Sequence, residues 1–94
     1  MKKIMWDDII MDKYQVIRVS CDNFNVVILE TFDCFNSACA YLQKYVDEQY
    51  ELDKNWLKCY HDSESCVSIY RYFWLSPKVL VDKIHIIKFK IAVQ

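Results

Sequence analysis

The fold is decided by residues 14–32, YQVIRVSCDNFNVVILETF, which hold two runs rich in β-branched residues around a short polar break. Val, Ile and Thr favour extended backbone because their branched side chains pack well on a pleated surface. The pair Asp22-Asn23 separates the runs, and Asp and Asn tolerate the left-handed backbone of a tight turn better than other non-glycine residues. The stretch therefore predicts a β-hairpin.

A helical pattern follows this hairpin, because apolar side chains recur three and four positions apart. The pattern predicts one main helix over residues 37–51, capped at its start by Asn36 or Ser37 and ended by Asn55. The side chains that define the apolar stripe are Ala38, Tyr41, Leu42, Tyr45, Val46 and Tyr50.

Three further extended segments complete the chain. Residues 56–61 and 66–74 are joined by a short polar loop and predict a second hairpin. Pro77 lacks a backbone N–H group and is expected to interrupt pairing before a last strand that begins at Val79. Residues 1–94 therefore form a single α+β domain with the order ββαβββ, in which an antiparallel four- to five-stranded sheet carries the main helix on one face.

The N-terminal segment has a weaker helical pattern. Trp6, Ile9, Ile10 and Lys13 follow Met5 at helical spacing, and acidic residues take the other side. This spacing predicts a short N-terminal helix or a docking arm.

The strands carry apolar residues on both faces. A sheet that is covered on one side alternates apolar and polar residues, but residues 26–29 are apolar at every position, and Tyr70, Tyr72 and Trp74 lie on the face opposite Ile69. One helix covers one face. The second face must be covered by the N-terminal arm, by a second copy of the chain, or by a ligand that favours aromatic surfaces.

The last strand changes its apolar face between Ile86 and Ile87. This change predicts a β-bulge, or a passage from one packing environment to another. A long apolar strand at a chain terminus is also a natural edge for pairing with a second chain. We therefore expect a homodimer, and the predicted dimer contacts are Ile84, Ile86, Ile87, Phe89 and Ile91.

The sequence contains no glycine. Phosphate-binding loops, dinucleotide-binding fingerprints and the nucleophile elbow of hydrolases all require glycine for close backbone approach or positive φ. The sequence therefore favours a non-enzymatic interaction protein, without a cofactor, that acts by binding another protein.

A second function is compatible with the aromatic residues of the second hairpin. Aromatic side chains on a sheet face can stack unpaired bases while cations hold phosphates, as in single-stranded nucleic-acid-binding proteins. The formal net charge of −1 makes a protein partner the preferred expectation. The candidate partner-binding residues for either ligand are Lys58, Tyr60, Tyr70, Arg71, Tyr72 and Trp74.

The five cysteines form an odd set without a C-x2-C pair. This usage is typical of reduced thiols in an intracellular protein. Cys59 and His61 lie two positions apart, about 6–7 Å along a strand and too far for a direct hydrogen bond. We expect no catalytic dyad and no metal site, although a zinc site is conceivable from two sets: Cys34 with Cys39, and Cys59 with His61 and Cys66.

One stretch resembles a known group of proteins. Residues 28–42, ILETFDCFNSACAYL, join a strand, a Phe, a polar cap and an Ala-aromatic-Leu helix start. This arrangement is similar to that of small uncharacterised proteins of large double-stranded-DNA viruses of protists. The resemblance implies a viral protein that acts by binding, in the virion or in the host cytoplasm or nucleus. No apolar run is long enough for a membrane span.

Overall fold

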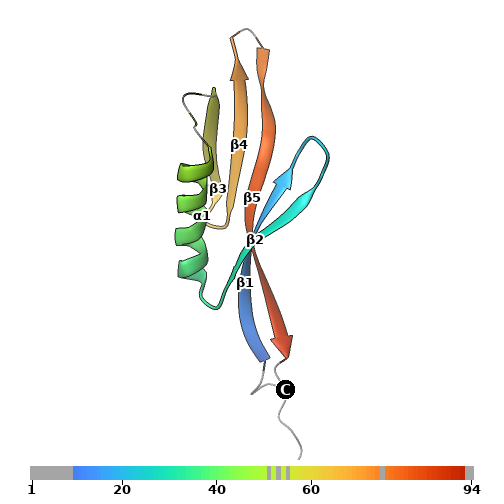
Figure 1. Ribbon diagram of the computed structural model, residues 1–94, viewed down its shortest axis with the longest axis vertical. Helices are drawn as coiled ribbons and strands as arrows, with labels where there is room; N and C mark the ends of the chain where they lie inside the picture. The colour runs from blue at the N-terminus through green and yellow to red at the C-terminus, as the bar shows by residue number, and fades with distance from the viewer. Residues whose placement is uncertain (1–9, 51, 53, 55, 75, 93–94) are drawn as a thin grey trace, which may run out of the picture.

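The computed structural model describes residues 10–50, 52, 54, 56–74 and 76–92, and these form five strands and one helix. The order ββαβββ and the α+β class are as the sequence predicts (Figure 1). The elements are β1 Ile10–Ser20, β2 Val26–Phe32, α1 Phe35–Gln49, β3 Leu57–Ser63, β4 Cys66–Phe73 and β5 Ser76–Ala92.

The five strands form one antiparallel sheet in the order β2-β1-β5-β4-β3. The prediction that the last strand is an edge is wrong, because β5 lies at the centre. Its 17 residues are long enough to pair with β4 along residues 76–85 and with β1 along residues 82–92. Figure 1 shows β5 running past both hairpins. The edges of the sheet are β2 and β3.

The predicted bulge between Ile86 and Ile87 is also wrong, since the register of β5 against β1 is continuous there. The apolar side chains of β5 change face because α1 covers one part of the strand and not the other. Ile84 and Ile86 are 0% and 8% exposed in the core beneath α1, whereas Ile87 points to the opposite face and is 41% exposed. Two of the predicted dimer contacts, Ile84 and Ile86, are therefore core residues.

Helix α1 buries its apolar stripe against the middle of the sheet. Ala38, Leu42 and Val46 are its buried residues, and they recur at the four-residue spacing that places side chains on one helix face. They share one core cluster with strand residues. The strand members of the cluster are Val16, Leu57, Val67, Ile69, Ile84 and Ile86.

The helix ends differ from the predicted ones. Cys34 occupies the N-cap position, so α1 begins before Asn36 and Ser37, and the Cys34 side chain makes no capping hydrogen bond. At the other end, the backbone N–H of Tyr50 donates to the Val46 carbonyl over 3.2 Å. The predicted stop at Asn55 lies outside the described residues.

Polar contacts fix α1 to the sheet at its C-terminal end. The Arg18 guanidinium donates to the Tyr45 hydroxyl over 2.8 Å, and the Tyr50 hydroxyl donates to Asp82 over 2.8 Å. Burial and the Asp82 hydrogen bond raise the pKa of Tyr50 far above its usual range, so this donor stays protonated. These bonds tie α1 to β1 and to β5, the two central strands that it covers.

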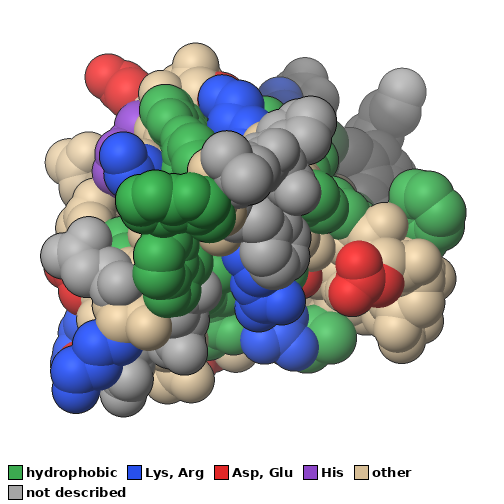
Figure 2. Space-filling view, turned by 90° about the horizontal axis from the view of Figure 1, so that it is seen from above, with side chains coloured by type: hydrophobic (Ala, Val, Ile, Leu, Met, Phe, Trp, Pro, Cys, Tyr) green, Lys and Arg blue, Asp and Glu red, His purple; other side chains and the backbone are tan. Residues whose placement is uncertain are grey.

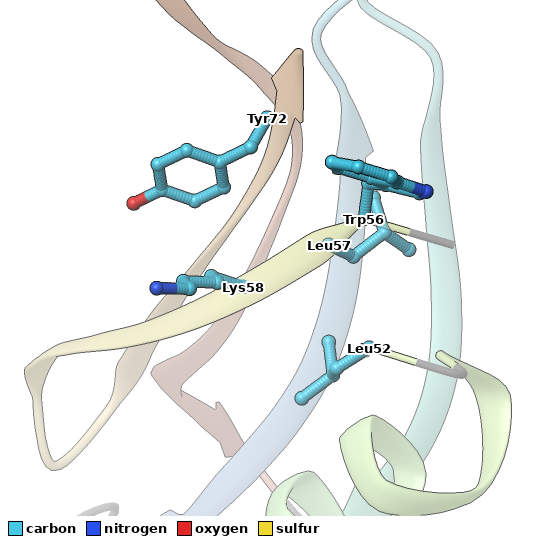
Figure 3. Close-up of a pocket in the computed structure, with 5 residues that line it drawn as sticks. All are labelled: Leu52, Trp56, Leu57, Lys58 and Tyr72. Atoms are coloured by element: carbon cyan, nitrogen blue, oxygen red, sulfur yellow. The ribbon is translucent and has the colours of Figure 1, made fainter. Parts of the chain in front are cut away.

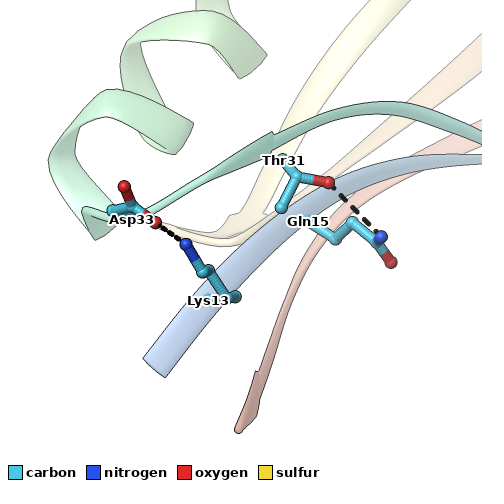
Figure 4. A network of polar contacts seen from close by, with 4 residues as sticks. All are labelled: Lys13, Gln15, Thr31 and Asp33. Atoms are coloured by element: carbon cyan, nitrogen blue, oxygen red, sulfur yellow. Dashed lines mark hydrogen bonds and ion pairs between the residues drawn. The ribbon is translucent and has the colours of Figure 1, made fainter. Parts of the chain in front are cut away.

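Polar contacts also join β1 to β2 just before α1 (Figure 4). Lys13 forms an ion pair with Asp33, and the Gln15 side-chain amide donates to Thr31 over 3.4 Å. The ion pair sets where the chain leaves β2 to enter α1.

The first hairpin turns where predicted, but the residue with left-handed backbone is different. Phe24 has φ 58°, and the Asn23 side chain accepts a hydrogen bond from the Asn25 amide over 3.0 Å. The Asx-type bond at Asn23 shapes the turn, and positive φ falls on the next residue. Phe24 is left 79% exposed at the tip.

Two predictions about strand limits are corrected. Ile10 to Lys13 belong to β1 and not to a helix, while the rest of the predicted N-terminal helix lies outside the described residues. The strand β5 begins at Ser76, with Pro77 as its second residue, where an absent N–H group is tolerated. Among the described residues, no helix is long and apolar enough to cross a membrane.

We predict that Ile84→Ala lowers the free energy of unfolding by about 2–5 kcal/mol, because the shortened side chain leaves a cavity beneath α1. Ile84→Val should cost about 0.5–1.5 kcal/mol. Val79→Ala, at a site that is 49% exposed, is the control and should cost less than either substitution. Equilibrium denaturant unfolding measures all three, and equal losses at residues 84 and 79 would contradict the assigned core.

Candidate binding face of the sheet

The face of the sheet opposite α1, which we call the open face, carries two groups of side chains. Strand alternation assigns residues to it, because Val16 and Ile84 point towards the helix and their neighbours along each strand point away. The aliphatic zone lies on β2, β1 and β5 and consists of Ile17, Val19, Val26, Ile28, Ile87, Phe89 and Ile91. The aromatic-lysine zone lies on β3, β4 and β5 and consists of Lys58, Tyr60, Tyr70, Tyr72 and Lys78.

The aromatic-lysine zone is held by contacts between rings and ammonium groups. Tyr60 and Tyr70 meet edge to face with 5.4 Å between ring centroids, and the Lys78 ammonium lies 4.6 Å from each centroid. The Lys58 ammonium lies 5.0 Å from the centroid of Tyr72. The hydroxyl groups of Tyr60 and Tyr72 are hydrogen-bonded, which raises the pKa of Tyr72. Each cation–π contact at an exposed site contributes about 0.5–1 kcal/mol.

Four of the six predicted partner-binding residues meet in this zone, namely Lys58, Tyr60, Tyr70 and Tyr72. Arg71 is separated from them, because it pairs with the buried Leu57 and so shares the helix side of the sheet. Trp74 follows the end of β4 and is 83% exposed.

Lys78 is a member of the zone that the sequence analysis missed. Its place opposite Tyr60 and Tyr70 depends on two register shifts between β4 and β5, at Ile69/Tyr70 and at Arg71/Phe73. The second shift falls at Pro77 and Lys78, where the sequence predicts that pairing is interrupted. Among the described residues, neither Lys58 nor Lys78 forms an ion pair with a carboxylate, in contrast to Lys13 and Lys88.

A groove adjoins the aromatic-lysine zone at the start of β3. It has a volume of about 370 Å³ and is lined by Leu52, Trp56, Leu57, Lys58 and Tyr72. Figure 3 shows the rings of Trp56 and Tyr72 on opposite sides of the groove. Seen from this end of the molecule, hydrophobic side chains lie next to those of Lys and Arg (Figure 2).

Trp56 is displayed in the groove by an unusual backbone. Its φ is 58°, a left-handed conformation that costs roughly 1–2 kcal/mol for a residue with a side chain. Two backbone hydrogen bonds fix it: the Tyr72 amide donates to the Trp56 carbonyl over 2.8 Å, and the Leu57 amide donates to the Leu52 carbonyl over 2.6 Å. The indole is 58% exposed as a result.

A polar band separates the two zones. Ser68 is buried and donates a hydrogen bond to Asp62, while the Cys66 sulfur lies 3.8 Å from Asp62 Oδ2 and 4.0 Å from His85 Nε2. Burial raises the pKa of the Cys66 thiol and lowers the pKa of His85. The pair is therefore a protonated thiol beside a neutral imidazole, which is a poor arrangement for nucleophilic attack because the thiolate is the reactive form.

The other cysteine–histidine pair lies on the helix side of the sheet. The Cys59 sulfur is 3.9 Å from His61 Nε2, so the prediction that the pair is too far apart for a direct hydrogen bond is wrong. The spacing of about 6–7 Å applies to the bases of the two side chains, whose ends lean together on one face. Burial raises the pKa of Cys59. Cys66 is on the open face, so the three residues cannot share a metal ion. No group of three or more His, Cys, Asp or Glu in the described part of the chain is arranged to hold one.

Comparisons with protein-family models, with curated proteins and with solved structures find no match to this chain. The resemblance to small proteins of large DNA viruses stays a prediction.

We predict that Cys34 reacts first with iodoacetamide near neutral pH. Backbone N–H groups of Ser37 and Asn36, at the start of α1, stabilise its thiolate and lower its pKa, and the residue is exposed. Cys59 and Cys66 are partly buried with raised pKa values and should react later. Peptide mapping by mass spectrometry over time measures the order. Modification of Cys59 as fast as Cys34 would contradict it.

Proposed function

We propose that this chain is a non-enzymatic protein-binding module that forms a homodimer through the aliphatic zone of the open face. The observation that carries the proposal is the exposure of aliphatic side chains on the face that α1 does not cover: Ile28 is 60% exposed, Ile87 41% and Ile91 37%. Exposed apolar surface of this kind is typical of interaction sites. Ile87, Phe89 and Ile91 are the predicted dimer contacts that remain in this proposal.

The edge strand β2 supports the same proposal. It pairs with β1 alone, and Val26, Val27 and Ile28 are 59%, 41% and 60% exposed, so apolar groups flank its free edge on both faces. The other edge, β3, carries Lys58, Tyr60, His61 and Asp62 instead. Charged and polar residues protect an edge from pairing, whereas an apolar edge invites it. In the sequence, the uninterrupted apolar run of residues 26–29 indicated this apolar edge strand.

A second copy of the chain is the partner that fits this surface best. A twofold interface brings the same patch of two subunits together, so the aliphatic side chains of the open face can pack against their own copies. Lys13 and Lys83, the register partners of Phe89 and Val19, share this face. A stable interface buries roughly 800 Å² on each partner, and the β2 edge adjoins the aliphatic zone.

The experiment is light scattering coupled to size-exclusion chromatography across a range of micromolar concentrations. The expected mass is twice the 11.4 kDa of the chain. Ile28→Lys should weaken the dimer at least tenfold, because a charge would be buried in an apolar interface. Val79→Lys is the matched control, since Val79 is 49% exposed outside the aliphatic zone, and it should leave the mass unchanged.

A monomeric mass at all concentrations would overturn the homodimer and would favour the N-terminal segment as the cover of the open face. Equal weakening by both lysine substitutions would overturn the assignment of the interface to the aliphatic zone.

The aromatic-lysine zone favours a second candidate function, which is binding of single-stranded nucleic acid. Three tyrosine rings are gathered with Lys58 and Lys78, and these ammonium groups form no ion pair with a carboxylate among the described residues. Aromatic rings stack bases, and unpaired cations attract phosphates. For both candidate functions we predict an intracellular location. The viral resemblance implies the host cytoplasm or nucleus, or the virion.

A further inference from the structure

The groove beside β3 combines flat aromatic walls, an apolar floor and one cation. Trp56 and Tyr72 supply the walls, Leu52 and Leu57 supply apolar surface, and Lys58 stands at the side of Tyr72 (Figure 3). The volume of about 370 Å³ falls in the range of small-molecule sites. Such a lining suits a planar ring that carries a negative charge.

The exposure of Trp56 is imposed by the fold. Its left-handed backbone, at φ 58°, is held by the hydrogen bond from the Tyr72 amide to its carbonyl, so the two groove walls are fixed to each other through the main chain. Strained backbone persists where the surrounding structure enforces it, and such positions cluster at ligand sites. The indole is thereby held at the surface next to Tyr72 and away from the core.

Positively charged side chains extend from the groove into the aromatic-lysine zone. Lys58 contacts Tyr72, the Tyr72 hydroxyl is bonded to that of Tyr60, and Tyr60 contacts Lys78. Two cations are thus spaced along one run of aromatic surface. This spacing matches a ligand in which flat rings and negative charges occur together.

We infer that the groove binds a nucleotide, with the base stacked on Trp56 and the phosphate at Lys58. The inference rests on the second candidate function, because the groove and the aromatic-lysine zone share Lys58 and Tyr72. The same chemistry is offered by a free mononucleotide and by one unit of a single strand. Binding in the groove is independent of the aliphatic zone and of the homodimer.

The test uses adenosine monophosphate, adenosine and a fluorescein-labelled single-stranded oligoadenylate on the full chain, by calorimetry and fluorescence anisotropy at low salt. Trp56→Ala should weaken the phosphate-bearing probes about tenfold, the scale of one lost base stack. Phe24→Ala is the matched control, since Phe24 is 79% exposed at the tip of the first hairpin and does not line the groove, and it should change nothing. Trp56→Phe keeps a ring and should retain most of the affinity, and circular dichroism verifies folding.

The phosphate is tested separately. Adenosine monophosphate should bind more tightly than adenosine, and Lys58→Gln should abolish that difference. Equal binding of the two probes by the unchanged protein would overturn the role of Lys58. Oligoadenylate affinity far above that of the mononucleotide would identify a strand as the natural source, and similar affinities would identify a free nucleotide; both results support the groove.

Two outcomes separate the groove from the second candidate function. Oligoadenylate binding that Trp56→Ala leaves unchanged would overturn the groove while the aromatic-lysine zone stands. Absence of binding by every probe would overturn both.

Discussion

The pairing of β5 on both of its edges is the constraint on which the rest of the structure depends. Residues 82–85 are bonded to β1 on one side and to β4 on the other, and this short overlap joins the two hairpins into one sheet. Helix α1 is anchored there, since Tyr50 bonds to Asp82 and the helix stripe packs over Ile84. Without the overlap each hairpin would be a two-stranded unit, which is marginally stable by itself.

This arrangement gives the two faces of the sheet different surfaces. Among the described residues, α1 covers the middle of one face, and the opposite face carries side chains that cannot all be buried within a chain of this size. The first hairpin places aliphatic residues on that face and the second places tyrosines and lysines, with buried Ser68 and its bond to Asp62 between them. The surfaces proposed for self-association and for ligand binding therefore use different residues of the open face, although β5 contributes to both.

The sequence predicts the local elements because periodicity and turn residues determine them. The β-branched runs of residues 14–32, the turn pair between them and the stripe of α1 lead directly to the fold class. The position of β5 is not encoded locally, since strand order depends on pairing between distant segments. An apolar terminal strand has the same local pattern at an edge and at the centre of a sheet, and the pairing of β5 with both β1 and β4 distinguishes the two. Arg71 was misplaced because residues close in sequence were assumed to share one face of the sheet. Lys78 was missed because Pro77 predicts an irregular pairing of β4 with β5 but does not predict the register that results.

Amide hydrogen exchange, measured residue by residue by NMR, tests the central position of β5 most directly. Amides of the doubly paired segment 82–85 and of its partners in β1 and β4 should exchange most slowly, through global unfolding alone. Amides of the edge strand β2 should exchange faster. Exchange in residues 82–85 as fast as in β2 would place β5 at an edge and contradict the account.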